Sequence, residues 1–222
     1  MKRTLFKTGD GSYTLHIPEW DEQYHSKHGA IAEALHVFIK EGLYHWLSRN
    51  SEKAVSILEI GFGTGLNAFL TYLETEKNSF TVHYTAIEAF PLEVTEVQKL
   101  NYTSLLNASE ELFLQMHRVP WEEIHGISEK FHLKKQQQFF SEISSGNCFN
   151  LIYFDAFGIR VQPELWTEEI FGKMYMALKP NGVLVTYAAN GNARRAMQAV
   201  GFKVERLAGP PGKKEMLRAT KK

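Results

Sequence analysis

The chain has 222 residues, 44% of them hydrophobic, and its formal net charge is zero. That size and composition suit one well-buried domain. The N-terminal segment 1–6 contains no apolar run of the kind that a signal peptide or a membrane span needs. We therefore expect a single domain over residues 1–222 that is cytoplasmic and contacts no membrane. The one cysteine excludes an intrachain disulfide and disfavours a thiolate zinc site.

The first fifty residues have a pattern of their own. Residues 5–17 alternate loosely around Gly9-Asp10-Gly11-Ser12, which predicts a β-hairpin with a tight turn. Over residues 30–47, apolar side chains recur every three or four positions, which predicts an amphipathic helix. We expect this hairpin and helix to form an N-terminal extension, residues 1–50, in front of a core that spans residues 51–222.

The core begins with an apolar strand that breaks into three alternate glycines and then into a helix, over residues 55–67. Glycines at such a turn allow positive φ and a close backbone approach to a ligand. The spacing Gly61, Gly63, Gly65 does not fit the dinucleotide fingerprint, whose last glycine comes one position later. Glu59, inside the strand end, would also repel a pyrophosphate and suits a cationic ligand group. A plain strand-to-helix turn without a ligand is the alternative reading.

The pattern Glu-x-Gly-x-Gly-x-Gly resembles the first motif of class I methyltransferases that use S-adenosylmethionine (SAM). The resemblance implies that SAM is the cofactor and that Glu59 faces its cationic amino-acid end. It further implies that the turn accommodates the nucleoside. The residues that the resemblance assigns to cofactor binding in this stretch are Glu59, Gly61, Phe62, Gly63, Gly65 and Asn67.

Two later strands also end in a carboxylate. Residues 81–88 end at Glu88, about where a nucleotide-binding α/β unit places the acid that accepts hydrogen bonds from ribose hydroxyls. Residues 150–155 end at Asp155, which predicts a carboxylate in the crevice at the carboxyl edge of the sheet. Asp155 is thus the candidate catalytic residue. The alternatives are a surface glutamate for Glu88 and a helix cap for Asp155.

The rest of the chain alternates strands with helices. The expected elements are helices over 91–100, 110–117, 167–178 and 192–200, a third strand from 131, a turn at 179–182, a strand over 183–187, and an antiparallel pair over 203–207 and 215–219. Lys134-Lys135-Gln136-Gln137-Gln138 follows the third strand, where methyltransferases commonly have an acid that contacts adenine. The predicted fold is α/β, a Rossmann-like seven-stranded sheet with helices on both faces and a small N-terminal hairpin.

Matches along nearly the whole chain resemble the methyltransferase part of the MnmC family, which completes 5-methylaminomethyl-2-thiouridine at the tRNA wobble position. The matching stretches are Tyr24–Gly29, Glu59–Asn67, Phe154–Phe157 with Pro163–Trp166, and Gly212–Arg218. The resemblance implies N-methylation of a 5-aminomethyl group. The pocket residues that it implies are Tyr24, His28, Gly29, Phe157 and Trp166. The family's FAD-dependent oxidoreductase domain has no counterpart in these 222 residues, so we expect a separate upstream oxidoreductase.

Charge is unevenly distributed along the chain. From residue 190 onward there are nine Lys and Arg against two Glu. This basic C-terminal segment, residues 190–222, predicts contacts with the tRNA backbone near the anticodon loop, and a solvated tail is the alternative. His25 and His28 lack further ligands at a recognisable spacing, so no metal is expected. Two other functions stay open, a methyltransferase for a small molecule and a SAM- or tRNA-binding module without catalysis.

Overall fold

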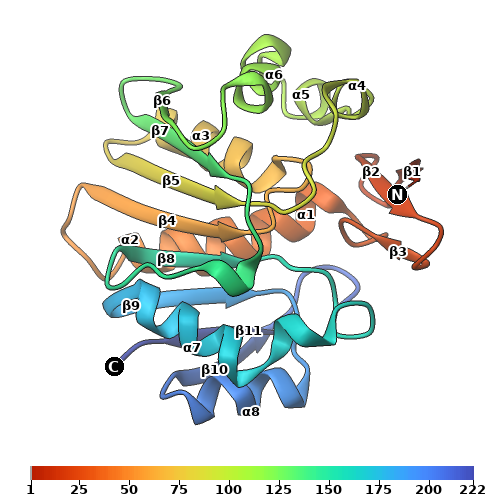
Figure 1. The fold of residues 1–222 in the computed structure, drawn as a ribbon. Coiled ribbons are helices and arrows are strands. Elements are labelled where there is room, and N and C mark those ends of the chain that lie inside the picture. Colours follow the sequence, from red (N-terminus) through yellow and green to blue (C-terminus); the bar gives the residue numbers. More distant parts are fainter. Residues whose placement is uncertain (1) are drawn as a thin grey trace.

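A computed structural model describes residues 2–222. Over this range the strands form one large mixed sheet of eight strands and a separate sheet of three strands at the N-terminal end (Figure 1). The order in the large sheet is β10-β11-β9-β8-β4-β5-β7-β6. None of the helices in the described part of the chain is long and apolar enough to cross a membrane.

The N-terminal extension consists of β1 (Thr4–Lys7), β2 (Tyr13–Ile17), β3 (Glu22–Gln23), α1 (Ala30–Ala34), η1 (Leu35–Tyr44) and α2 (His45–Leu47). The predicted hairpin is confirmed, since β1 pairs antiparallel with β2. The predicted helix is also confirmed, with ten π-helical residues between its α-helical ends. A Cβ atom on Gly42 would lie 3.0 Å from Val185, so this glycine lets the helix pack closely on the large sheet.

The core consists, in chain order, of β4 (Ala54–Ile60), α3 (Leu66–Lys77), β5 (Thr81–Ile87), α4 (Val94–Val97), α5 (Tyr102–Leu105), α6 (Glu110–Arg118), β6 (Ile124–Gly126), β7 (Phe131–Gln136), η2 (Phe140–Glu142), β8 (Phe149–Phe154), η3 (Pro163–Trp166), α7 (Glu168–Ala177), β9 (Leu178–Thr186), α8 (Gly191–Ala199), β10 (Lys203–Ala208) and β11 (Glu215–Thr220). The predicted α/β class and the antiparallel final pair are confirmed.

Three details of the prediction are wrong. The large sheet has eight strands over residues 2–222 rather than seven, because the short β6 pairs with β7 at its edge. The helix expected from Pro91 begins only at Val94, where the Glu96 carboxylate accepts a hydrogen bond from the Glu93 N–H at 3.0 Å. The turn expected at 179–182 lies inside β9, as an irregularity in its pairing with β8 and a positive φ at Asn181.

The parallel centre of the sheet brings the carboxyl ends of three strands to one edge. Ile60 at the end of β4 is paired with Ile87 of β5 on one side and with Phe154 of β8 on the other. The next residues of all three strands, the glycine turn, Glu88 and Asp155, therefore leave the sheet side by side. This register is what assembles the candidate site.

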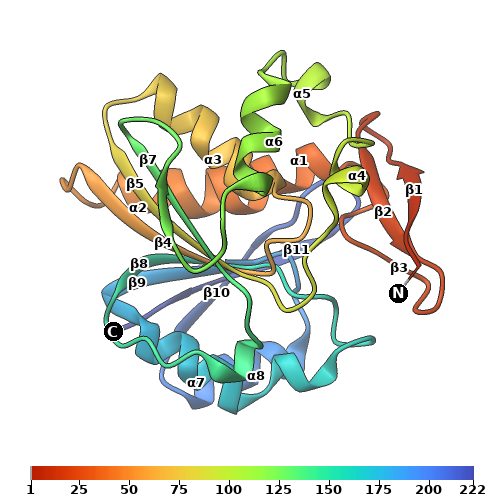
Figure 2. The same cartoon turned by 45° about the horizontal axis from the view of Figure 1, so that its top comes forward.

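A hydrophobic core lies on each of the two faces of the large sheet. Helices α1, η1, α3 and α6 cover one face, and α7 and α8 cover the other (Figure 2). Tyr84, Phe69 and Tyr153 are fully buried in the first core, and Phe154 and Phe171 in the second. Burial on both faces explains the continuous apolar runs of β4 and β8 in the sequence.

Several of the C-terminal basic residues are used inside the fold. Arg218 is nearly buried and forms ion pairs with Glu41 at 3.1 Å and Glu205 at 3.2 Å. Lys221 is buried and donates to the Leu178 carbonyl at 2.7 Å. These groups stabilise the packing of β11 and cannot also face a polyanion. The basic surface available to RNA is therefore smaller than the sequence count indicates.

Candidate active site

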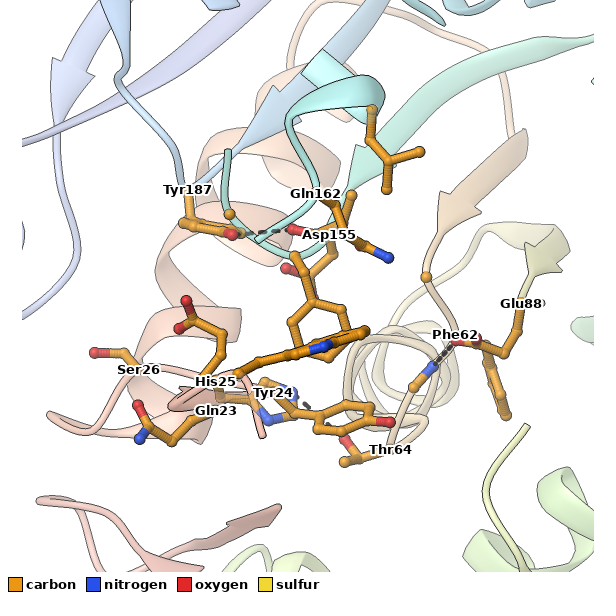
Figure 3. A pocket seen from close by; sticks show the side chains of 18 of the residues that line it. Gln23, Tyr24, His25, Ser26, Phe62, Thr64, Glu88, Asp155, Gln162 and Tyr187 are labelled. Atoms are coloured by element: carbon orange, nitrogen blue, oxygen red, sulfur yellow. Dashed lines mark hydrogen bonds between the residues drawn. The ribbon is translucent and has the colours of Figure 1, made fainter. Parts of the chain in front are cut away.

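A cavity of about 1030 Å³ opens at the carboxyl edge of β4, β5 and β8. Its walls come from the glycine turn, the segment after β5, the segment after β8, the loop 20–28 of the N-terminal extension, and residues 212–213 before β11. Figure 3 shows Tyr24, Thr64, Glu88 and Asp155 around this space. Ligand pockets usually measure about 300–1,000 Å³. The cavity can therefore hold a nucleoside-sized ligand together with part of a second one.

The glycine turn forms one wall of the cavity. Gly61 has a φ of 92°, and a Cβ atom there would lie 2.8 Å from the Asp155 carbonyl oxygen. Gly63 has a φ of 48° and lines the cavity. A Cβ atom on Gly63 would lie 3.2 Å from the Tyr24 ring. L-residues rarely adopt such φ values. The first glycine is thus needed for packing and the second keeps the turn open towards a ligand.

The other residues predicted at this turn have different positions. Phe62 and Asn67 line the cavity, although both side chains are largely buried. Gly65 lies behind the cavity wall and precedes α3 as its N-cap, with a φ of 73°. A Cβ on Gly65 would meet the His117 ring nitrogen at 2.6 Å. Gly65 therefore acts on a ligand only through the shape of the turn.

Glu88 joins β5 to the glycine turn. One carboxylate oxygen accepts a hydrogen bond from the Gly63 N–H at 3.0 Å (Figure 3). The other accepts a hydrogen bond from the Phe90 N–H at 2.9 Å. A carboxylate has about four lone-pair sites, so two of them remain for a ligand. The same side chain can order the turn and still accept hydrogen bonds from vicinal hydroxyls in the cavity.

Asp155 lies on the cavity wall directly after β8. Its Oδ2 accepts a hydrogen bond from the Asn67 side-chain amide at 2.8 Å. Burial, and then the negative charge of Glu33, raise the pKa of Asp155 to about 7. Asn67 Oδ1 is buried and has no hydrogen-bond partner within residues 2–222. Asn67 thus fixes the orientation of a carboxyl group that can gain or lose a proton near neutral pH.

Glu59 lies outside the cavity lining, beneath the turn. The side chain is completely buried, and its two carboxyl oxygens have no hydrogen-bond partner in the described part of the chain. Burial, followed by the charge of Asp155, raises the pKa of Glu59 well above its usual value. A buried carboxyl without partners is held neutral. The structure thus places Glu59 outside the cavity lining, whereas the sequence led us to expect that it faces a cationic ligand group.

Aromatic side chains form the wall opposite the turn. The Phe157 ring meets Tyr24 edge-to-face at 5.0 Å and Trp20 at 5.5 Å between centroids. The structure does not bring Trp166 into this wall, since its ring is buried in the second core. Its indole N–H donates to the Phe157 carbonyl at 2.8 Å. Trp166 therefore positions Phe157 from behind, and the expectation that it lines the pocket is corrected.

Of the other two residues expected in the pocket, His28 lines the cavity and is exposed. Gly29 is buried outside the lining, where a Cβ would lie 2.7 Å from the Asp10 carboxylate. Gly29 thus permits the loop to pack on the β1–β2 turn. No group of three potential metal ligands occurs among the described residues.

His25 has a role that the sequence did not indicate. Its Nδ1 contacts the Thr14 hydroxyl of β2 at 2.9 Å, and its Nε2 lies 3.4 Å from the Thr64 hydroxyl in the glycine turn. Burial lowers the pKa of His25 to about 4, so the imidazole is neutral at physiological pH. The ring therefore connects the N-terminal sheet to the glycine turn and holds the cavity wall in place.

At the end of the cavity beside Glu88, two exposed aromatic rings stand at the rim. Phe90 follows β5 and Phe139 follows β7, and their ring centroids are 6.0 Å apart. The third strand ends without an acid, as the sequence predicted. Flat apolar faces near the Glu88 carboxylate suit a planar base attached to a ribose. Neither ring could be assigned from sequence, because no motif surrounds it.

Comparisons with known proteins agree with this geometry. A family model described as S-adenosyl-L-methionine-dependent methyltransferase matches residues 94–222. The "tRNA 5-methylaminomethyl-2-thiouridine biosynthesis bifunctional protein MnmC" of Leptospira interrogans is 32% identical over 212 residues, which cover 90% of this chain and 32% of that protein. The protein of the same name from Idiomarina loihiensis is 27% identical over 219 residues, which cover 89% of this chain and 35% of that protein. The chain thus spans about a third of the curated relatives that it matches.

Two solved structures are similar to the whole fold. MNMC2 from Aquifex aeolicus has a TM-score of 0.75 and 25% identity, and the match covers 98% of this chain and 70% of that one. A spermidine synthase in complex with the transition-state analogue AdoDATO has a TM-score of 0.61 and 16% identity, and the match covers 99% of this chain and 70% of that one. At this identity the likeness shows the fold alone. The predicted cofactor and enzyme class are confirmed: the chain belongs to the S-adenosyl-L-methionine-dependent methyltransferase family.

Proposed function

We propose that this site methylates the amine of a 5-aminomethyl group on a tRNA wobble uridine. The observation that carries the proposal is Asp155, a carboxylate with a pKa of about 7 held by Asn67 on the cavity wall beside the glycine turn. The printed names of the relatives, which concern 5-methylaminomethyl-2-thiouridine biosynthesis in tRNA, supply the substrate. A tRNA substrate would in turn agree with the cytoplasmic location expected from the sequence.

The residues present fit SAM. The excess of carboxylates in the cavity lining suits the ammonium of the methionyl group, and the free lone pairs of Glu88 suit the ribose hydroxyls. Phe90 and Phe139 would flank the adenine. When bound, SAM supplies a methyl group on a cationic sulfur, which keeps the electrons of the broken sulfur–carbon bond.

Asp155 is the group that prepares the nucleophile. An amine attacks only as the free base, so the ammonium form must first lose a proton. Asp155 accepts that proton in our proposal, because its raised pKa lies within reach of an alkylammonium. Asp155 passes this proton to solvent, and the restored carboxylate then accepts a hydrogen bond from the neutral amine, which orients the nitrogen lone pair, and stabilises the charged secondary ammonium product. Tyr24 and Phe157 exclude water from this side and offer faces for an extruded base.

The charge of the cavity favours an amine over a phosphate. Among the described residues, seven carboxylates line the cavity against three Lys or Arg. The carboxylates are Asp21, Glu22, Glu33, Glu88, Asp155, Glu164 and Glu169, and the cations are Arg3, Lys27 and Lys213. A net negative cavity attracts an ammonium group and repels an RNA backbone. The phosphates of the anticodon loop must therefore stay at the rim.

Four basic residues stand near that rim. Lys27 lines the cavity mouth, Lys214 follows the cavity residue Lys213, and Arg194 and Arg195 lie in the first half of α8, which begins at the carboxyl edge of β9. We propose that these four residues, rather than the whole basic segment 190–222, hold the tRNA backbone.

The relatives are named bifunctional, and the amine that this site would methylate must come from another activity. We propose that a FAD-dependent oxidoreductase supplies it, as the family resemblance implies.

The function is tested by incubating the protein with methyl-labelled SAM and three acceptors. We expect label in tRNA whose wobble uridine carries a 5-aminomethyl group, and none in the same tRNA with an unmodified uridine. The third acceptor is a mixture of small amines, which the acidic cavity could also attract. Label in the small amines alone would identify a small-molecule methyltransferase, and label nowhere would leave a binding module.

The proposed backbone contacts predict a defined salt dependence. Changing Lys27, Arg194, Arg195 and Lys214 to Gln should weaken tRNA binding about tenfold or more at moderate salt, and should lower the slope of log affinity against log salt by about 3. Filter binding over a salt series measures both. The control changes Lys53 and Lys203, exposed residues at the opposite end of the parallel strands. Equal losses in both variants would contradict the assignment.

A further inference from the structure

Lys213 lies on the cavity wall in a fixed position. Its Nζ contacts a Glu33 carboxylate oxygen at 2.5 Å and lies 3.8 Å from the centre of the Tyr187 ring. The Glu33 side chain is 8% exposed, and its other oxygen accepts the Ser26 N–H at 2.8 Å. An ammonium group has three N–H donors. Glu33 takes one donor and the ring attracts the charge, so Lys213 retains donor capacity towards the cavity.

This ammonium group is close to the proposed catalytic carboxylate. The Tyr187 hydroxyl donates to the carbonyl of Ala156, the residue after Asp155, at 2.9 Å (Figure 3). Lys213 stacks on that same tyrosine, so one aromatic ring separates it from the peptide that carries Asp155. Its positive charge also opposes the rise in the pKa of Asp155 that burial and Glu33 cause. The cavity thus presents an acceptor and a cationic donor on neighbouring walls.

We propose that Lys213 donates a hydrogen bond to a carbonyl oxygen next to the carbon that bears the aminomethyl group of the substrate. This inference rests on the proposed function, since in a 5-aminomethyluracil the C4 carbonyl is adjacent to C5. When the substrate amine is hydrogen-bonded to Asp155 in our proposal, the C4 carbonyl oxygen (O4) lies on the same edge of the base and faces Lys213. The 2-position is on the far side of the ring and is not read by this residue.

A neutral carbonyl of the substrate suits the remaining donors of Lys213 better than a carboxylate does. Glu33 already neutralises Lys213, and Asp155 is a further carboxyl group close by. A third carboxylate, such as that of SAM, would add net negative charge to this corner of the cavity. A carbonyl oxygen accepts the remaining donor without that repulsion.

The assignment has a consequence for base selection. Uracil presents an acceptor at position 4, whereas cytosine presents an amino group, which is a donor. An amino group opposite Lys213 leaves the cavity-facing N–H of the ammonium without an acceptor and places two hydrogen-bond donors against each other. The enzyme should therefore discriminate against 5-aminomethylcytosine through Lys213. Hydrogen bonds to charged groups correspond to a discrimination of about ten- to hundredfold.

The test uses two anticodon stem-loop RNAs that differ only in 5-aminomethyluridine or 5-aminomethylcytidine at the wobble position. We expect wild-type kcat/KM to favour the uridine RNA about tenfold or more, and Lys213→Met to reduce the ratio to near one by loss on uridine. The double variant Glu33→Gln/Lys213→Met should show the same loss of the uridine-to-cytidine ratio, and it leaves no buried Glu33 carboxylate without a partner. It therefore separates an effect on specificity from an effect on folding. Lys203→Met, an exposed lysine at the other end of the sheet, is the matched control.

The affinity for SAM is measured separately for each variant by calorimetry, and we expect values within about twofold of wild type. An unchanged uridine-to-cytidine ratio in both Lys213 variants would overturn the assignment. Loss of SAM affinity with an unchanged ratio would give Lys213 to the cofactor carboxylate instead. A wild-type protein that methylates neither RNA would refute the proposed function itself, and this inference with it.

Discussion

Changing Asp155 to Asn or Ala is expected to reduce methyl transfer about a thousandfold while SAM still binds. General-base catalysis typically contributes about 10²- to 10⁴-fold. The amide of Asn can still accept a hydrogen bond from Asn67, which contacts Asp155 at 2.8 Å, so the wall keeps its shape. Single-turnover transfer of labelled methyl measures the rate, and calorimetry measures SAM affinity. Full turnover in the Asn variant would remove Asp155 from the chemistry.

The pH dependence gives an independent check on Asp155. The raised pKa of about 7 leaves the group protonated, and unable to accept a proton, at lower pH. Wild-type kcat/KM should therefore rise with pH through about 7, and the Asn variant should lack this inflection. The native state also holds the Asp155 proton more tightly than the unfolded chain, so wild-type stability falls as pH rises from about 4 to about 7. The difference in Tm between the Asp155→Asn variant and wild type should therefore be a few degrees more positive at pH 8 than at pH 4.

Glu88→Ala should have the opposite phenotype, a loss of SAM affinity of about a hundredfold. Two hydrogen bonds from ribose hydroxyls to a charged group correspond to about 3 kcal/mol. The variant also loses the contacts to the Gly63 and Phe90 N–H groups, which order the turn. Calorimetric titration with SAM measures the loss. At saturating SAM the remaining rate should stay within about tenfold of wild type, since Glu88 lies away from the proposed reacting amine.

Glu88→Gln is the matched variant. Its side-chain oxygen can keep one of the two backbone contacts, but its amide group cannot accept from a hydroxyl. We expect an intermediate loss of affinity, about tenfold. A Gln variant as tight as wild type, or an Ala variant that binds SAM normally, would show that Glu88 only shapes the turn.

The parts of this site that the sequence predicted are those fixed by local pattern. An apolar strand followed by glycines or by an acid indicates its own carboxyl end, so Gly61, Glu88 and Asp155 could be placed together before the structure was known. Trp166 was misplaced because an aromatic residue after a strand packs equally well inward or outward. Whether it faces the core depends on Phe171 and Phe154, which meet it from other elements.

The residues missed by sequence analysis act through contacts between distant segments. Lys213 and Glu33 are 180 positions apart, and Lys213 appeared in the sequence only inside a matching stretch and as one more charge in a basic region. His25 was considered as a metal ligand, because its contacts with Thr14 and Thr64 depend on how the N-terminal sheet docks. The eighth strand was missed for a simpler reason. Three residues are too few to show any alternation.

The cavity is built from segments far apart in the chain, since its lining runs from Arg3 to Lys213. A ribosome must therefore release all of this stretch before the pocket can close, and a partly folded product has no complete place for the cofactor. Because a ligand that binds only the native form stabilises it by mass action, SAM should protect the entire chain against global unfolding and proteolysis. Cofactor retention thus reports whether residues 3–213 have folded together.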